Sequence, residues 1–474
     1  MRKIVAILVG LTPFFIAPQP TFAHSFGKLY NLPVPFWMYL YGGVAAIVAS
    51  FLVIGYFINK TNPSNNYPTI NLSKFRFVTF LTSAWFLTVL KGISVFLFLL
   101  TIVAGFVGID FPSFNIGMTL FWIIFALGLT YLTAFIGNIY ALINPLKVGA
   151  DVVEKILGEK IKGIVKYPER LGYYPALVFY FLFIWIELFA ETGPLQLSMI
   201  LVQYVMLNVL GVALVGKNAW FTYCEFFSVF FRLIGKMAPV ECKRGKLFLR
   251  PPFVGLIKEK AEHFSLLLFI LFMLSSTAFD GFRETTPFYR LYWQNLDDVF
   301  RPILGANSYE TYQTLALFLS PFVFLSVYLL LIWLAKAVTN TKLSLRELSL
   351  QFAFSLIPIA FVYNVAHYYT LVVTEGSNMG RLISDPFGKN WNLFGTANWP
   401  NIPTVDTNFV WHSQVAFILL GHIVGVYIAH IIALKVFPSH KKALISQFPL
   451  LILMVIYTMA GLWILSQPIT SGLE

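Results

Sequence analysis

The hydrophobic pattern of the chain consists of long apolar stretches separated by short polar segments. Most of these stretches reach the roughly 20 residues that an α-helix needs to cross about 30 Å of hydrocarbon. The pattern predicts an all-α fold, a polytopic transmembrane helical bundle with about ten spans. The predicted spans are residues 36–58, 92–109, 119–143, 171–190, 196–215, 262–279, 312–336, 348–373, 409–436 and 445–466.

Two further apolar segments are weaker candidates for spans. The apolar segment 77–90 ends before Lys91 and is too short to span a membrane, so it predicts an interfacial or re-entrant helix. Residues 219–238 are aromatic but interrupted by Glu225 and Arg232, and their placement stays open. The bundle is therefore expected to carry one or two interfacial helices beside its spans.

The first 23 residues have the layout of a secretory signal peptide. Arg2 and Lys3 precede a short apolar stretch, residues 4–16, and small residues lead up to Ala23. The alternative is an uncleaved first helix. Cleavage after Ala23 would leave residues 24–474 as a single integral membrane domain that begins with His24.

The loop charges predict the orientation of the bundle. With the mature N-terminus outside, the cytoplasmic loops are 59–76, 144–170, 216–261, 336–347 and 435–444, and they hold 24 of the 33 lysines and arginines. The outer segments hold 6. This excess follows the positive-inside rule. We therefore expect a multi-pass protein of the bacterial inner membrane with both mature termini on the outer side.

Composition agrees with this pattern and excludes several classes of protein. The chain is 58% hydrophobic and 11% charged, with a mean hydropathy of +0.76, whereas a soluble chain is about 25% charged. The net charge of +12 is explained by the cytoplasmic loops and by anionic lipid, so no nucleic-acid partner is expected. Cys224 and Cys242 are too few for a disulfide framework. No phosphate-binding G-x-x-x-x-G-K-[ST] loop occurs, so ATP is not expected as a partner.

Few ionisable side chains fall at membrane depth, where charge is costly and usually functional. Glu187 and Glu191 are four residues apart near the outer end of their span, so they are predicted either to share a helix face or to form a boundary pair in water. Asn364 and His367 are predicted to share a face in the outer half of theirs. Asp280 stands at the outer end of the sixth span, where it serves either chemistry or a helix-ending turn.

The span 409–436 holds three histidines at different depths. His412 lies at the outer rim, His422 near the middle and His430 in the inner third. At 1.5 Å per residue, His412 lies about 15 Å from His422 along the axis, while a metal–nitrogen bond measures about 2 Å. One ion therefore cannot bind all three, and each can instead be a hydrogen-bonded packing residue. We favour that second interpretation for His430.

The outer layer is the one place where imidazole and carboxylate ligands are expected to converge. His367 and His412 fall there, and His24 would begin there with a free amine. Asp280 and Asp385 are on the same side and can act as a further ligand or as a base. Such a set suits one divalent ion, zinc or copper, whose bound water would be a nucleophile. No H-E-x-x-H or H-x-H spacing supports it.

Several short stretches together resemble a family of bacterial polytopic membrane proteins that is commonly labelled fenitrothion hydrolase. The stretches are NP at 144–145, LRPP at 249–252, STAFDGF at 276–282, AHYYT at 366–370 and SDPFGKNWNLFGTA at 384–397, with Ala23-His24 and Gly421-His422. The last of the five is the most specific. The resemblance implies hydrolysis of an organophosphate triester with loss of a nitrophenol. It implies no catalytic residues.

Two functions from different classes follow from these features. The first is a metal-dependent membrane hydrolase of organophosphate-like esters, with an outward-facing site and a small lipophilic substrate. The second is a transporter or metal-handling permease that uses His422 with Asn364, His367 and Glu187. Depth discriminates between them, because a permease needs essential residues at the midplane and on both sides. An accessory subunit of a larger membrane complex is a third interpretation.

Overall fold

Helices make up nearly all of the structure. The computed structural model describes residues 35–58, 67–243, 245–400 and 405–467, so the predicted signal peptide and His24 lie outside the described residues. Within these ranges, nine helices are long and apolar enough to cross a membrane. A tenth apolar helix, α9, has 16 residues. The prediction of an all-α polytopic bundle with about ten spans is confirmed.

The membrane-crossing helices follow the predicted stretches closely. They are α2 (Phe36–Phe57), α4 (Ala84–Val107), the continuous segment α5 (Ile116–Met118), η3 (Thr119–Gly128) and α6 (Leu129–Ile136), α9 (Tyr174–Phe189), α10 (Pro194–Val215), α14 (Phe264–Arg283), α17 (Ser308–Thr339), α19 (Ile357–Ser377), α21 (Thr407–Val436) and α22 (His440–Ser466).

Short elements connect these helices at the two ends of the bundle. The short helices are α3 (Arg76–Leu81), α7 (Tyr140–Ile143), α8 (Pro145–Leu157), α11 (Lys217–Ala219), α12 (Phe226–Gly235), α13 (Val254–Lys258), α15 (Thr286–Asn295), α16 (Asp297–Leu304), α18 (Leu345–Phe352) and α20 (Met379–Ser384). The strands β1 (Ile70–Asn71), β2 (Val240–Lys243) and β3 (Lys246–Leu249) form one antiparallel sheet in the order β1-β3-β2.

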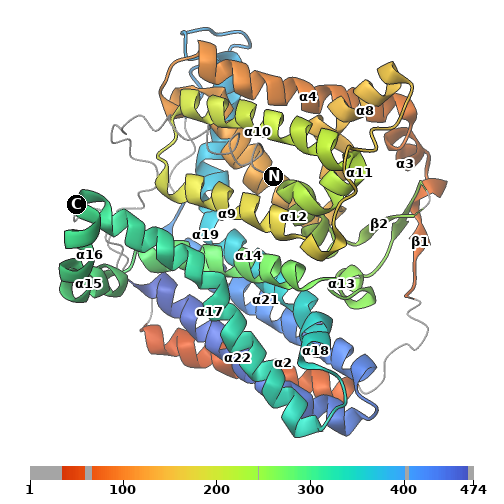
Figure 1. The fold of residues 1–474 in the computed structure, drawn as a ribbon, viewed down its shortest axis with the longest axis vertical. Coiled ribbons are helices and arrows are strands. Elements are labelled where there is room, and N and C mark those ends of the chain that lie inside the picture. Colours follow the sequence, from red (N-terminus) through yellow and green to blue (C-terminus); the bar gives the residue numbers. More distant parts are fainter. Residues whose placement is uncertain (1–34, 59–66, 244, 401–404, 468–474) are drawn as a thin grey trace.

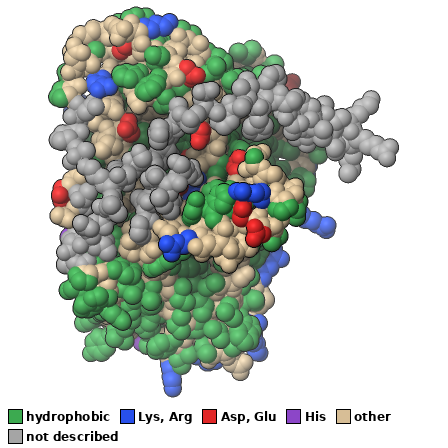
Figure 2. Space-filling model, turned by 90° about the vertical axis from the view of Figure 1, so that its left-hand side faces the viewer, with side chains coloured by type: hydrophobic (Ala, Val, Ile, Leu, Met, Phe, Trp, Pro, Cys, Tyr) green, Lys and Arg blue, Asp and Glu red, His purple; other side chains and the backbone are tan. Residues whose placement is uncertain are grey.

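The two ends of the bundle differ in what they carry. The small sheet, α3, α8, α13 and α18 gather at the right-hand end in Figure 1, while α15 and α16 lie at the left-hand end. The right-hand end is formed by the loops predicted to be cytoplasmic. Figure 2 faces the opposite end, where acidic side chains are scattered above a continuous apolar flank. We call the end with α15 and α16 the outer end.

Helix α14 is the centre of the packing. Its sequence is apolar on all sides, which is typical of a helix surrounded by other helices, and 83% of its apolar window is buried. It contacts α9, α17 and α19, and α19 in turn packs against α21. The outer end of α14 therefore meets the middle of α19 inside the protein.

Helix α2 comes first in the described chain but packs with the last two helices. It lies against α21 and α22 (Figure 1). Its other face presents Tyr41, Leu52 and Tyr56, which are exposed. Exposed aromatic and aliphatic side chains on a spanning helix are suited to contact with lipid, so this face belongs to the membrane-facing flank of the bundle.

The segment 77–90 differs from its prediction. A separate interfacial helix was expected there, but α3 ends at Leu81 and the long helix α4 already begins at Ala84. Ser83 accounts for this start, because its hydroxyl accepts a hydrogen bond from the Phe86 amide and caps the helix. Lys91 therefore lies inside α4, and its long side chain can place the charge away from the apolar surface.

Two further helix boundaries differ from their predicted positions because of the local backbone and a side-chain cap. The third span ends at Ile136 rather than at 143, because Gly137 adopts a φ of 125° and ends the helix. The placement of the segment 219–238 was left open by the sequence. Its helical structure is interrupted at Glu225, just before α12. The Glu225 carboxylate caps α12 by accepting hydrogen bonds from the Phe227 and Ser228 amides. Because of this interruption, residues 219–238 do not form one straight span. Most residues of α12 are buried, so the segment belongs to the interior of the bundle.

Candidate functional site

The outer end of α14 and the middle of α19 bring two of the predicted site residues into direct contact. The His367 Nε2 atom lies 2.7 Å from the Asp280 Oδ2 atom. The Tyr368 hydroxyl donates to the same oxygen at 2.8 Å. Asp280 lies in the last turn of α14 and is buried, and His367 and Tyr368 are adjacent on α19. A carboxylate at this depth is thus held by two donors from a neighbouring helix.

Arg283 completes the coordination of the Asp280 carboxylate. Its Nε atom lies 3.2 Å from Oδ1 of Asp280, and its Nη1 donates to the Leu188 carbonyl of α9 at 3.0 Å. The guanidinium also lies 3.3 Å from Glu284. Because a buried charge is tolerated only when it is paired and hydrogen-bonded, these contacts explain how an ionised aspartate persists here. They also tie the outer end of α9 to that of α14.

Glu187 adds a second carboxylate to this group. It lies on α9 beside the Tyr368 hydroxyl and within electrostatic reach of Asp280 and His367. We call Glu187, Asp280, Arg283, His367 and Tyr368 the outer cluster.

Glu191 does not belong to the outer cluster, which agrees with the second of the two alternatives, a boundary residue in water. The helix α9 ends at Phe189, so Glu187 and Glu191 do not share a helix face. Glu191 lies exposed in the turn before α10 with a φ of 37°. Helix α10 follows with Gly193 at its N-cap and Pro194, a residue suited to the first position of a helix.

The second ring nitrogen of His367 is not engaged by the outer cluster. With Nε2 bonded to Asp280, the Nδ1 atom makes no hydrogen bond among the described residues. The side chain is 28% exposed, against 10% for Asp280. Gly281 lies beneath the ring: a Cβ built on it would come 4.0 Å from Nδ1. An imidazole oriented by a carboxylate and open at its other nitrogen can accept and return a proton.

His412 and Asp385 lie apart from the outer cluster. His412 is exposed near the start of α21, where its Nδ1 donates to the Asn408 carbonyl at 2.7 Å and its Nε2 lies 3.3 Å from the Tyr39 hydroxyl. Asp385 accepts from the Lys389 and Asn390 amides at 2.8 and 2.7 Å. Both side chains bond within their own surroundings, so the structure does not join them to His367 or Asp280.

The stretch 384–397 forms a folded outer loop. The Ser384 hydroxyl accepts from the Phe394 and Thr396 amides, and the Phe387 carbonyl accepts from the Ile109 amide beyond the end of α4. Gly388 has a φ of 67° and packs against Ile109. The most specific motif of the family resemblance thus has a clear structural use, and Asp385 is one of its turn-forming residues.

His422 and Asn364 lie deeper in the bundle. The His422 side chain is fully buried, and its Nδ1 donates to the Ile418 carbonyl at 2.8 Å. Its Nε2 and the Asn364 Oδ1 are buried without a hydrogen-bond partner among the described residues. The Tyr363 ring lies 5.9 Å from the His422 ring. By contrast, both nitrogens of His430 are bonded, to Gln447 and to the Ile58 carbonyl, in agreement with a packing role.

The predicted divalent ion finds no assembled ligand set in the part of the chain that the structure describes. No group of three histidine, cysteine, aspartate or glutamate side chains there could hold a metal. Asp280 has both carboxylate oxygens engaged by protein donors. Because His24 lies outside the described residues, a zinc or copper ion remains a prediction. The two cysteines are free, Cys224 buried and Cys242 exposed.

Two members of the outer cluster were not predicted as site residues. Arg283 stands three residues after Asp280, a spacing at which side chains on one helix meet. Tyr368 directly follows His367 in the AHYYT stretch. Helical spacing could have identified Arg283 once α14 was extended beyond residue 279, whereas only packing reveals that Tyr368 faces Asp280.

Comparisons with known proteins add no family to this description. No protein-family model, no curated protein and no solved structure matches the chain.

Proposed function

We propose that the protein is a membrane hydrolase whose outer cluster activates a water molecule against a lipophilic ester. The observation that carries the proposal is the 2.7 Å contact between His367 Nε2 and Asp280 Oδ2, which leaves Nδ1 of a partly exposed imidazole as a base. The excess of lysine and arginine in the opposite loops supports an orientation in the bacterial inner membrane with this site outward.

Each residue of the outer cluster has a role in the proposed reaction. The His367 Nδ1 takes a proton from water as the water oxygen attacks phosphorus or an acyl carbon. The bond to the leaving oxygen breaks with its electron pair, and the imidazolium returns the proton to that oxygen. Asp280 stabilises the imidazolium, while Arg283 and Tyr368 hold Asp280 in place. A positioned base of this kind contributes about 10²- to 10⁴-fold to the rate.

The substrate class follows from the resemblance and from the setting of the site. An organophosphate-type triester is uncharged and lipophilic, so it partitions into a membrane. His367 lies within a helix long and apolar enough to span one. A substrate dissolved in the outer leaflet could therefore approach the imidazole without a large soluble domain.

The test is nitrophenolate release from a 4-nitrophenyl phosphotriester by the purified protein in lipid nanodiscs. We expect His367→Gln to lower kcat by about 10²- to 10⁴-fold. His412→Gln is the matched control, an outer-end histidine outside the outer cluster, and should keep the parental rate. Equal rates for the parent and His367→Gln would overturn the proposal, as would no turnover by the parent.

Elemental mass spectrometry on the same preparations tests the expected zinc or copper. One ion per chain in the parent that is lost in His367→Gln would make His367 a ligand rather than a free base. No bound ion, together with turnover, would support the water-activating role of His367.

A permease is the second candidate, supported by the buried polar atoms around Tyr363. The Tyr363 hydroxyl donates to the Tyr457 carbonyl at 2.5 Å, and the ring of His422, whose Nε2 has no partner among the described residues, lies 5.9 Å from the Tyr363 ring. Such atoms at mid-membrane depth are typical of a substrate or proton path. Proton-linked uptake into proteoliposomes that is abolished by His422→Gln and retained by His367→Gln would favour this candidate.

A further inference from the structure

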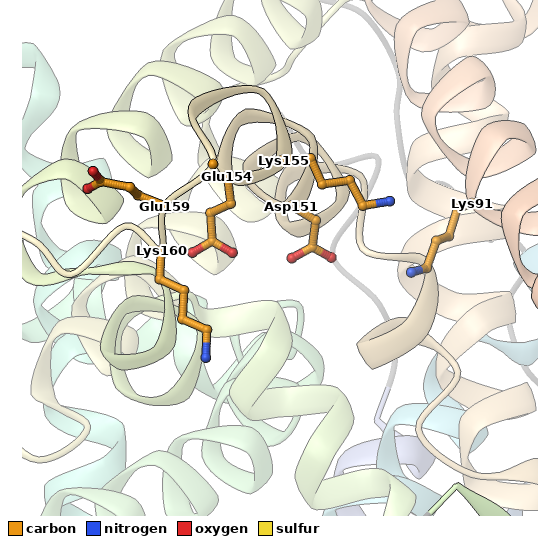
Figure 3. A pocket seen from close by; sticks show the side chains of 7 residues that line it. Lys91, Asp151, Glu154, Lys155, Glu159 and Lys160 are labelled. Atoms are coloured by element: carbon orange, nitrogen blue, oxygen red, sulfur yellow. The ribbon is translucent and has the colours of Figure 1, made fainter.

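A charged cavity lies between α4 and α8 at the end of the bundle opposite the outer cluster. It has a volume of about 450 Å³ and is lined by Lys91, Asp151, Glu154, Lys155, Gly158, Glu159 and Lys160. Figure 3 shows the Lys91 and Lys155 side chains extending toward the same gap from opposite sides. We call this space the lysine cavity.

The acidic side chains of the lysine cavity are largely engaged elsewhere. Lys217 forms ion pairs with Asp151, at 2.8 Å, and with Glu154. The Glu154 carboxylate also accepts from the Ile161 amide. Among the described residues, Lys91, Lys155 and Lys160 form no ion pair. Because Lys217 balances only one of the two carboxylates that it contacts, four ammonium groups accompany three carboxylates here, and the cavity with Lys217 has a net charge of +1.

The cavity lies where a membrane surface would meet the protein. Lys91 is the eighth residue of the spanning helix α4, about 10 Å from its first residue along the axis. Its neighbours Val89 and Ile93 are exposed. The Ser94 hydroxyl donates to the Ile143 carbonyl at 2.6 Å, which holds the chain leading into α8 against α4. Lys91 therefore lies in the first third of α4, on a part of the helix with exposed apolar side chains.

Helix α8 has two different faces at this level. Asp151, Glu154 and Lys155 line the cavity, while Val152 and Ile156 are exposed. A helix with one charged and one apolar face lies in the plane of the membrane interface. The apolar face gives acyl chains a surface next to the lysines, which a free phosphate ion would not use.

We infer that the lysine cavity binds the phosphate headgroup of an anionic phospholipid, with Lys91 and Lys155 as its main ligands and Lys160 at the rim. The acyl chains lie along α4 and the apolar face of α8. This end of the bundle is the one that the charge distribution assigns to the cytoplasmic leaflet. The inference is independent of the reaction proposed for the outer cluster.

The test is native mass spectrometry of the full chain titrated with phosphatidylglycerol, phosphatidylcholine or inorganic phosphate. We expect phosphatidylglycerol to be retained in preference to the other two. Each lysine near a membrane surface contributes about fivefold in affinity, so Lys91→Gln with Lys155→Gln should weaken retention about 30-fold. Lys342→Gln is the control, because Lys342 is exposed at the same end of the bundle and outside the cavity.

Two results would overturn the inference. Equal retention of phosphatidylglycerol by the double variant and by Lys342→Gln would show that the lipid binds elsewhere. A preference for inorganic phosphate over the lipid would make the cavity a soluble-anion site. Thermal unfolding of the double variant at the parental midpoint ensures that lost retention reports on binding and not on folding.

Discussion

The outer cluster and the lysine cavity show two ways in which this membrane protein handles charge. In the outer cluster, Asp280 is buried, and donors from His367, Arg283 and Tyr368 engage it. In the lysine cavity, Lys91, Lys155 and Lys160 have no ion pair among the described residues. In the first region, side chains of the protein itself pair the buried charge. In the second, unpaired ammonium groups can bind a ligand.

The difference follows from the cost of desolvation. An unpaired charge in the interior is very unfavourable, so a buried carboxylate requires built-in partners. At the membrane surface an ammonium keeps part of its hydration, and an unpaired lysine costs little. We therefore expect substitutions in the outer cluster to change stability strongly, and substitutions in the lysine cavity to change binding with little effect on stability.

The largest expected effect is that of removing the buried carboxylate. Asp280→Ala leaves Arg283 and His367 without their shared partner and should cost about 3–5 kcal/mol of unfolding free energy. Asp385→Ala is the matched control, because that carboxylate accepts two amide bonds at the surface and its loss should cost about 1 kcal/mol. Denaturation by SDS in mixed micelles measures both, and equal losses would contradict the comparison.

An intermediate effect is expected from adding a methyl group to two glycines with similar backbones. Gly388 and Gly158 have φ values of 67° and 71°. A Cβ on Gly388 would lie 2.3 Å from Ile109, whereas one on Gly158 meets nothing within 4 Å. Both alanine variants carry about 1–2 kcal/mol of backbone strain, and Gly388→Ala should lose about 1–3 kcal/mol more through overpacking.

Thermal unfolding midpoints test the pair of glycine variants directly. A larger loss for Gly388→Ala would show that the outer loop 384–397 is tightly packed while the turn at the lysine cavity is open. The reverse order would mean that the cavity around Gly158 is closed in the membrane.

The smallest expected effect concerns acid stability at the lysine cavity. The hydrogen bond from Lys217, with that from the Ile161 amide, lowers the pKa of Glu154 below its ordinary value of 4.5. A lowered pKa in the folded state means that the ion pair stabilises the fold above about pH 4.5 and is lost as the pH falls through the folded pKa. Glu154→Gln should therefore flatten the decline of the unfolding midpoint in this range.

Glu159→Gln is the control for the acid experiment, since Glu159 lines the same cavity without an ion pair among the described residues. It should retain the parental pH profile. An unchanged profile for Glu154→Gln would indicate that Lys217 and Asp151 hold α8 without it.

The most specific motif of the family resemblance does not supply the residues of the candidate site. The stretch 384–397 was its most specific part, and Asp385 was a candidate catalytic residue. The structure uses that carboxylate to close a turn, and within the described part of the chain no hydrogen bond joins it to His367. The AHYYT and STAFDGF stretches, by contrast, supply His367, Tyr368 and Asp280, which meet across two helices.

Hydrophobic pattern alone was enough to determine the class of protein, most span boundaries and the places of Asp280 and Glu187 near the ends of their helices. These properties are local, because a helix must cover the hydrocarbon thickness with apolar residues whatever its neighbours are. The boundaries that moved depended on caps and turns, such as Ser83 and Gly137, which a hydropathy pattern does not weigh.

Only the tertiary structure decided which helices are neighbours and which polar groups meet. The pairing of Asp280 with His367 spans 87 residues of sequence, and α2 packs against α21 and α22 from the other end of the chain. The apolar surfaces of spanning helices are chemically alike, so side-chain fit and interhelical hydrogen bonds select the partner. That choice is why His367 joined the outer cluster while His412, at the same end of the bundle, did not.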